Sequence, residues 1–161
     1  MFFKQFYLPD LGHASYLVGS EETGEALVLD PRRDVDEYFA SAQEQGLRIG
    51  YAGDTHQHND YLSGVSELPA REDVKLLAPA RAELGYPVRR MADGQTLELG
   101  EVVFQFLDTP GHTPEHTALL VTDRSRSEEP AFLLSGGALL VGDVARPDLL
   151  GGGEATRRNA R

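Results

Sequence analysis

Short apolar runs separated by polar turns dominate the first part of the chain. These runs have the length of β-strands, and they cover residues 2–8, 14–19, 25–30 and 47–52. The polar segment 20–24 joins the second run to the third, which predicts a β-hairpin. Pro31 is expected to end the third strand, because proline cannot donate a hydrogen bond to a neighbouring strand.

A helical spacing of apolar residues follows the third strand. Four apolar side chains recur at i, i+3, i+4 and i+7, as on one face of a helix; they are Val35, Tyr38, Phe39 and Ala42. We predict a helix over residues 35–45, with Asp34 as its N-cap and Gly46 at its end. A second helix is predicted to begin near Tyr61 and to cover residues 62–68.

The second half of the chain has the pattern of a β-meander. Strands are predicted over residues 74–78, 96–99, 102–107, 117–121 and 134–139. The whole pattern predicts a mixed α/β (α+β) fold. A length of 161 residues fits one domain, residues 1–161, with a sizeable core.

Composition and charge narrow the classes of partner. The net charge of -11 disfavours nucleic acid and anionic membrane surfaces, because both would repel the chain. No apolar run is long enough to cross a bilayer, and the start lacks the pattern of a signal peptide. The absence of cysteine excludes disulfides and thiolate ligands. We therefore expect an acidic, cytoplasmic globular domain.

The segment 55–61 carries the first candidate chemistry. It holds His56, His58 and Asp60 in alternating positions just after the predicted strand 47–52. Imidazole and carboxylate together suit zinc, iron or manganese, and a loop at the end of a strand is a common place for metal ligands. The alternative is a polar turn whose histidines cap a helix that begins at Leu62.

The segment 108–116 is the second candidate. Proline and glycine force a tight turn that can present His112 at the end of another strand. A single turn histidine is commonly exposed or capping, so the prediction that His112 binds metal depends on its pairing with segment 55–61. His116 follows four residues later and is expected to support the site without binding the metal.

These motifs together resemble the metallo-β-lactamase superfamily. His-x-His-x-Asp at 56–60 and Thr-Pro-Gly-His-Thr-Pro at 109–114 resemble in particular its persulfide dioxygenase and glyoxalase-II-like branch, which includes rhodanese-linked proteins. Segments 3–7, 13–19, 30–35 and 142–149 fit the same branch. The resemblance implies an αββα sandwich with a metal site at one edge of two facing sheets.

The resemblance also implies roles for individual residues. In the dioxygenases one Fe(II) is held by the residues that match His56 and His112 and by a later aspartate, a facial triad that leaves positions open for dioxygen and substrate. In hydrolytic relatives the matches of His58 and Asp60 help to hold a second metal, and a metal-bound hydroxide attacks a thioester. Arg146 matches a substrate-contacting arginine, suited to a glutathione carboxylate; the alternative is an ion pair with Asp143 or Asp148.

Three departures from the family pattern affect these expectations. Gly137 stands where the family has the aspartate ligand, and Asp143 is the next acid along the chain. Tyr61 stands where two-metal hydrolases have histidine, which argues against a binuclear site. The chain also ends earlier than family members do, so we expect a fragment that lacks the C-terminal part of the sandwich; the alternative is a short variant whose sheet is completed in a homodimer. A longer parent chain could carry a rhodanese domain.

Three functions remain open from the sequence. The first is Fe(II)-dependent oxidation of glutathione persulfide, or a similar persulfide, to sulfite. The second is a hydrolase that uses zinc at His56, His58 and His112 on a thioester. The third is a non-catalytic, sulfur-binding module, for which Gly137 is the main argument. In the enzymatic cases Asp60 is expected to be catalytic, and Tyr61, His116 and Asp143 are expected to support the metal ligands.

Overall fold

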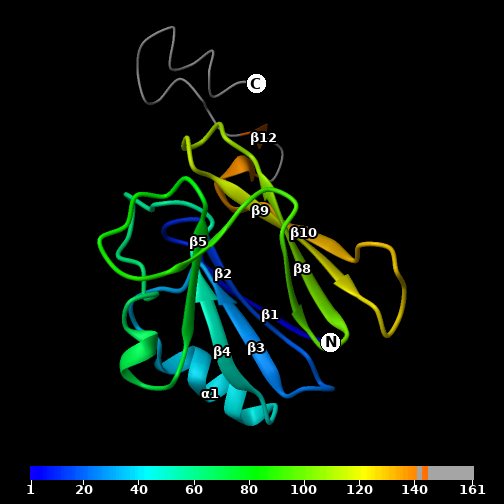
Figure 1. Cartoon of the computed structure of the whole chain (residues 1–161). Coiled ribbons are helices and arrows are strands. Elements are labelled where there is room, and N and C mark those ends of the chain that lie inside the picture. Colours follow the sequence, from blue (N-terminus) through cyan, green and yellow to red (C-terminus); the bar gives the residue numbers. More distant parts are fainter. Residues whose placement is uncertain (141–142, 145–161) are drawn as a thin grey trace, which may run out of the picture.

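Two β-sheets lie face to face and form the body of the protein (Figure 1). The computed structural model describes residues 1–140 and the backbone of residues 143–144. The first sheet has the order β1-β2-β3-β4-β5-β6. Its strands are β1 (Phe2–Leu8), β2 (His13–Gly19), β3 (Glu25–Leu29), β4 (Arg48–Gly53), β5 (Lys75–Pro79) and β6 (Arg89–Met91). The first three strands are antiparallel, and β3 to β6 are parallel.

The second sheet is antiparallel and has the order β10-β9-β8-β7. Its strands are β7 (Thr96–Leu99), β8 (Val102–Asp108), β9 (Thr117–Asp123) and β10 (Phe132–Leu134). Two short 3₁₀ turns, η1 (Leu68–Ala70) and η2 (Gly136–Ala138), lie outside the sheets. A small hairpin of β11 (Leu139–Leu140) and β12 (Asp143–Val144) follows η2.

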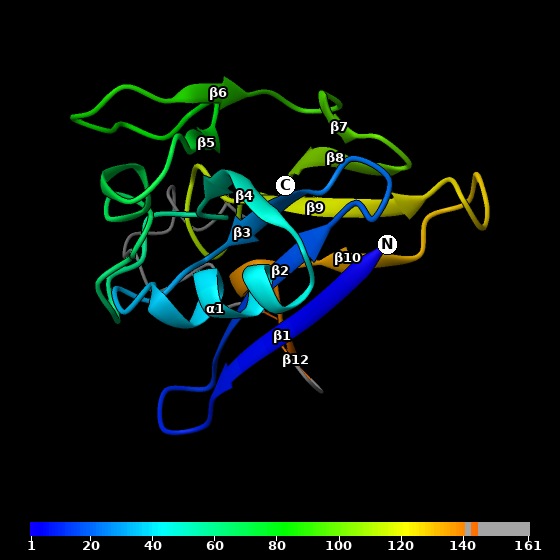
Figure 2. The ribbon, with the colours of Figure 1, turned by 90° about the horizontal axis from the view of Figure 1, so that it is seen from below.

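Helix α1 (Asp36–Glu44) covers the outer face of the first sheet (Figure 2). Alternate residues of β3 face two different core layers, one between the sheets and one beneath the helix. Leu27 and Leu29 point between the two sheets, whereas Ala26 and Val28 pack in the cluster that includes Tyr38 of the helix. A strand that is buried on both faces needs apolar residues at every position, as in other sheets with parallel strands. Within the described residues these layers form an αββ arrangement, three of the four layers of the sandwich that the resemblance implied.

Most sequence-based elements are confirmed, with three corrections. The strands over the first half, the hairpin and the helix at 35–45 are present, and Gly46 has the positive φ of 68° expected after a helix. Asp34 is not the N-cap, because Val35 takes that position without a side-chain hydrogen bond. The predicted helix at 62–68 is wrong, and only η1 forms there. The predicted strand at 134–139 is also wrong, since its centre turns as η2.

Long-range contacts explain why residues 62–68 do not form a helix. Ser63 makes an isolated β-bridge with Arg32, and the Gly64 amide donates to the carbonyl of Pro31 at 2.8 Å. This pairing holds the segment extended against the chain that leaves β3. None of the helices in the described part of the chain has the length and apolar character needed to span a bilayer.

Gly64→Ala is expected to lower the free energy of unfolding by at least about 1–3 kcal/mol. A Cβ atom at this position would collide with the carbonyl group of Arg32 and would press on Val35. Gly85→Ala is the matched control, because a Cβ there meets no atom within 4 Å, and we expect a change within about 0.5 kcal/mol. Urea denaturation of both variants checks the prediction. Equal stabilities for the two would contradict it.

Candidate metal centre

All five histidines of the chain gather at one end of the two sheets. His13 begins β2, His56 and His58 lie in the loop after β4, and His112 and His116 lie in the loop between β8 and β9. The ring centroid of His56 lies 4.0 Å from that of His58, 4.7 Å from that of His112 and 5.0 Å from that of His116. The structure therefore brings together the two motifs that the sequence singled out.

Hydrogen bonds donated by backbone amides join the two histidine loops. The Thr117 amide donates to the Thr55 carbonyl at 2.9 Å, and the Gln57 amide donates to the Glu115 carboxylate at 2.9 Å. The loop after β4, the β8–β9 loop and η2 meet at the upper end of the molecule in Figure 1. Because each sheet contributes one loop, the site spans the seam between the sheets.

Asp30 anchors the first loop. It is buried, directly follows β3 and is, among the described residues other than glycine, the one with a positive φ, 52°. Its carboxylate accepts from the Thr55 amide at 2.6 Å, from the Thr55 hydroxyl at 3.0 Å and from Nε2 of His58 at 3.1 Å. Burial alone would raise the pKa of Asp30, but the His58 hydrogen bond and charge hold it below its usual range. A strained backbone held by this many contacts is typical of functional sites.

This anchoring sets the tautomer of His56. The Thr55 hydroxyl donates to Asp30, so it can only accept from the imidazole, whose Nδ1 lies 2.8 Å away. Nδ1 of His56 then carries the proton, and Nε2 is left free as a metal ligand. Burial, assisted by the charge of His58, lowers the pKa of His56 to about 3. His56 is therefore neutral at physiological pH, the form that binds metals.

His56 and His112 fit a single transition-metal ion. Two imidazoles that bind one ion through nitrogens about 2.1 Å from it place their ring centroids roughly 4.5–5.5 Å apart. The observed separation is 4.7 Å, with the ring planes at 84°. When bound, such an ion would supply Lewis-acid or redox chemistry at this edge of the sheets.

Gly137 faces the same place but brings no donor. A Cβ atom on Gly137 would lie 2.5 Å from Cδ2 and 2.9 Å from Nε2 of His112. Position 137 therefore points at the Nε2 edge of the imidazole, where the resemblance expects a carboxylate. The donor set found here is imidazole-rich, and position 137 does not complete a facial triad.

His58 lies beside two carboxylates, that of the buried Asp30 and that of the partly buried Asp54. Among the residues that the structure describes, one group of potential ligands has atoms that all lie within 4.8 Å of one another: Asp30, Asp54 and His58. Burial, together with the charge of Asp30, raises the pKa of Asp54 to about 7. Sequence reasoning missed both aspartates as site residues, although Asp30 and Asp54 each sit at the end of a strand.

Asp60 and Tyr61 flank His58. The Asp60 side chain is 55% exposed, and its Oδ1 lies 3.8 Å from Nδ1 of His58. The Tyr61 hydroxyl donates to the Asp30 carbonyl at 3.2 Å, and its ring packs against that of His58 at 4.4 Å. Burial raises the pKa of Tyr61 far above its ordinary value, so the phenol stays protonated. Tyr61 is thus a hydrogen-bond donor to the loop that holds the site.

His116 supports His56 from behind. It is fully buried, its ring stacks on that of His56, and its Nδ1 lies 2.8 Å from the Thr109 hydroxyl. A Cβ on Gly136 would lie 2.7 Å from Nε2 of His116, so the backbone of η2 closes directly over the ring. Two further predicted positions cannot be placed: Arg146 and the side chain of Asp143 lie outside the described residues.

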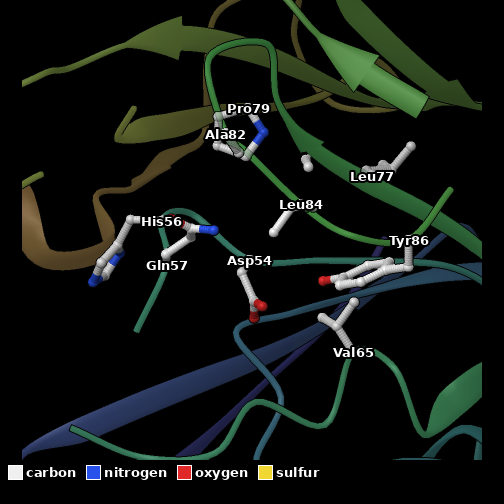
Figure 3. Close-up of a pocket in the computed structure, with 10 residues that line it drawn as sticks. Asp54, His56, Gln57, Val65, Leu77, Pro79, Ala82, Leu84 and Tyr86 are labelled. Carbon is white, nitrogen blue, oxygen red and sulfur yellow. The ribbon is translucent and has the colours of Figure 1, made fainter. Parts of the chain in front are cut away.

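A small pocket adjoins the site (Figure 3). It lies between the loop after β4 and the segment that leads from β5 to β6, and its volume is about 20 Å³. That volume holds about one water molecule. Its polar side is formed by Asp54, His56 and Gln57, and Figure 3 shows the Tyr86 hydroxyl directed toward Asp54. The pocket places the partly buried carboxyl group of Asp54 beside His56, a candidate metal ligand.

His116→Gln is expected to flatten the pH dependence of stability in the metal-free protein. Burial lowers the pKa of His116 to about 4, against 6.5 for a free imidazole. Between these values the unfolded chain takes up a proton that the native ring does not, so this contribution is fully present above pH 6.5 and is lost as pH falls toward 4. The difference in unfolding free energy between wild type and variant should shrink with falling pH, by at most about 1.4 kcal/mol per unit. Chelator-treated samples, melted in urea at several pH values, check this; parallel curves would contradict it.

Proteins of two enzyme classes are similar in sequence to this chain. No protein-family model matches the chain. A hydroxyacylglutathione hydrolase from Polaromonas sp. is 37% identical over 128 residues, 78% of this chain and 46% of that protein. The human mitochondrial persulfide dioxygenase ETHE1 is 30% identical over 151 residues, 90% of this chain and 55% of that protein. The chain spans about half the length of the curated relatives that it matches.

Solved structures share the fold. A metallo-beta-lactamase from Staphylococcus aureus superposes with a TM-score of 0.91 and 35% identity over 98% of this chain and 49% of that one. ETHE1 from Myxococcus xanthus gives 0.80 and 28% over 91% and 61%. A protein crystallised in a di-iron-bound form gives 0.70 and 26% over 98% and 83%. The two facing sheets thus have known counterparts.

Proposed function

Because this chain belongs to the metallo-β-lactamase superfamily, we propose that it is a metal-dependent enzyme acting on a small glutathione-linked sulfur compound. The reaction we favour is oxidation of glutathione persulfide, or a similar persulfide, to sulfite with one Fe(II). Such a reaction uses dioxygen and water: the terminal sulfur leaves as sulfite, dioxygen is reduced, and the inner sulfur departs as the free thiol. The observation that carries the proposal is the pairing of His56 with His112 across the seam between the sheets.

The length of one match and one residue favour the dioxygenase, whereas the identity is higher for the hydrolase, 37% against 30%. The match to persulfide dioxygenase ETHE1 extends over 90% of this chain, whereas the matched part is 78% for the Polaromonas hydrolase. Tyr61 also replaces the histidine that the resemblance assigns to two-metal hydrolases, and its phenol is kept protonated by burial. A protonated phenol is a poor metal ligand, so this position does not support hydrolytic two-metal chemistry.

The protein's own side chains have definable tasks in this proposal. Nε2 of His56 and the imidazole of His112 would hold the iron, and the Asp30–Thr55 pair keeps His56 in the binding tautomer. Asp54 lies beside His56 and changes protonation near neutral pH, so it can hold a proton at the pocket. Asp60 is the proposed catalytic carboxylate, because it reaches solvent at the mouth of the site. Arg146 is proposed to contact a glutathione carboxylate.

A zinc-dependent thioester hydrolase is the second candidate. The donor set is rich in imidazole, and three imidazoles with a water molecule make an adequate catalytic zinc site. His56, His58 and His112 would be those ligands. His58 would bind through Nδ1, because its Nε2 is held 3.1 Å from the Asp30 carboxylate.

Metal content and two assays separate the candidates. Protein purified without oxygen is analysed by plasma mass spectrometry beside Gly137→Asp. Oxygen uptake and sulfite are then measured with glutathione persulfide, and hydrolysis with a glutathione thioester. We expect iron near one equivalent at the His56–His112 pair and persulfide-dependent oxygen uptake. Zinc with thioester hydrolysis would favour the hydrolase, and iron with activity only in Gly137→Asp would identify a site that has lost catalysis.

A further inference from the structure

Gln57 lies between the two histidines of the loop after β4, and the proposed reaction assigns it no task. Its side chain is exposed, so packing contributes little to its position. It nevertheless makes hydrogen bonds to two different neighbouring segments of the chain. A residue that directly follows His56 and is held from two sides is suited to fix where that imidazole lies.

The backbone amide of Gln57 joins the two histidine loops. It donates to Oε1 of Glu115 at 2.9 Å, and Glu115 lies between His112 and His116 in the β8–β9 loop. A hydrogen bond from an amide to a carboxylate is charge-assisted and roughly twice as strong as a neutral one. This bond therefore connects the residue after His56 firmly to the loop that carries His112.

A second bond joins the same loops on the other side of His56. The Thr117 amide donates to the Thr55 carbonyl at 2.9 Å, so the residue before His56 is held as well. Metal ligands need to stay within roughly 0.5 Å of their productive positions. Bonds on both sides of His56 supply that constraint, and its ring centroid lies 4.7 Å from that of His112.

The side chain of Gln57 adds a bond to the segment between β5 and β6. Its Nε2 donates to the Glu83 carbonyl at 2.9 Å, and Figure 3 shows Gln57 beside Leu84 at the pocket. The Arg90 guanidinium donates to the Ala82 carbonyl, so this segment is itself held in shape. Gln57 thus connects the loop after β4 to one loop of the second sheet and to one segment of the first.

We propose that Gln57 is a positioning residue, which sets the separation of His56 and His112 and thereby the affinity of the metal centre. It acts through Glu115 on one side and through the Glu83 carbonyl on the other. It touches neither the ion nor the substrate. The inference rests on the metal centre of the proposed function, but the separation of the two rings can be measured without metal.

Glu115→Ala and Glu115→Gln test the bond at the Gln57 amide. Alanine removes the acceptor, whereas glutamine keeps an acceptor oxygen without the charge. In the metal-free protein, the nuclear Overhauser signal between the rings of His56 and His112 reports their separation. We expect the wild-type signal in Glu115→Gln and a signal several-fold weaker in Glu115→Ala, because the signal falls steeply with distance.

Metal binding supplies the second measurement. Zn(II) affinity, measured in competition with a chelating dye, should fall about 10-fold in Glu115→Ala, the lower end of the range for outer partners. The Co(II) absorption spectrum should change with it, because the coordination geometry changes. The urea midpoint of the metal-free variant should stay at the wild-type value, since the bond lies at an exposed position.

Gln57→Met tests the bond made by the side chain. Methionine has a similar length but no donor for the Glu83 carbonyl, so the ring signal and the Zn(II) affinity should both fall. Glu83→Ala is the matched control. It removes a carboxylate from the same segment but keeps the carbonyl that Gln57 uses, and it should behave as the wild type in every measurement.

The outcomes separate this inference from the proposed function. A wild-type ring signal and affinity in Glu115→Ala would overturn the inference, as would equal losses in Glu83→Ala or a lowered urea midpoint with an unchanged ring signal. A wild type that binds no metal but shows the expected ring signals would contradict the proposed function and still support the positioning role. If Glu115→Ala does not fold, Glu115→Met replaces it in the same measurements.

Discussion

Replacing His112 by alanine is expected to remove the ion that His112 shares with His56. The ring centroids of these two histidines are 4.7 Å apart, and Gly137 beside them supplies no donor. A single imidazole would remain, and a lone nitrogen does not hold a divalent ion against water. We expect metal content to fall by one equivalent and affinity at this site to fall more than about 100-fold, since even an outer partner contributes roughly 10–100-fold. Plasma mass spectrometry and calorimetric titration measure both quantities.

The matched comparison for His112→Ala is His116→Gln. Both residues lie in the β8–β9 loop, but His116 packs behind His56 and donates or accepts only at Thr109. His116→Gln should keep its ion with at most the loss expected of a supporting partner. If His112→Ala retains full metal content and affinity, the assignment of His112 as a ligand is wrong.

Asp30→Ala is expected to lower the free energy of unfolding by about 3–5 kcal/mol, the range seen when one partner of a buried charged pair is removed. The Thr55 amide, the Thr55 hydroxyl and the His58 ring would each lose their acceptor in a buried place. The same change would free His56 to adopt the other tautomer, because Thr55 could then donate to it. Urea denaturation of the metal-free protein measures the stability, and metal titration measures the loss at His56.

Asp30→Asn removes the negative charge of the side chain but keeps its size. An amide oxygen can still accept from Thr55, but it cannot stabilise a protonated His58. We expect a smaller loss than for alanine. The raised pKa of His58 implies that the pair's contribution is full below pH 6.5 and declines as pH rises through the folded pKa of His58; Asp30→Asn should lack this decline. Stability of Asp30→Ala within about 1 kcal/mol of the wild type would show that Asp30 is not an anchor.

The elements that local patterns determine were predictable, and those that depend on distant contacts were not. The spacing of Tyr38 and Ala42 located α1 because an amphipathic face is a property of the segment itself. The failure at 62–68 has the opposite cause: Gly64 is held by Pro31, and no pattern within the segment reveals that contact. Strand ends placed His56 and His112 together for a general reason, since loops at one edge of a sandwich converge.

The supporting residues of the site were largely invisible in the sequence. Asp30 reaches Thr55 across 25 positions, and an Asp-Pro pair after a strand looks like an ordinary strand end. His13 lies in no motif, and only the structure shows that its ring packs against that of Tyr61. Gly137 is the opposite case. Its departure from the family pattern is visible in the sequence alone, and the structure adds that a side chain at this position would point toward His112.

The seam between the two sheets also has a consequence for folding. The histidine edge joins residues from β2, the loop after β4 and the β8–β9 loop, so many intervening residues must be ordered before its contacts exist. Closing such long loops costs entropy before the contacts repay it. We therefore expect the sheets to form first and the histidine edge to form last. An ion that binds only the formed edge would then stabilise the native state. Hydrogen exchange at the Thr55 and Thr117 amides, slow with metal and fast without it, would show that the ion keeps this edge closed.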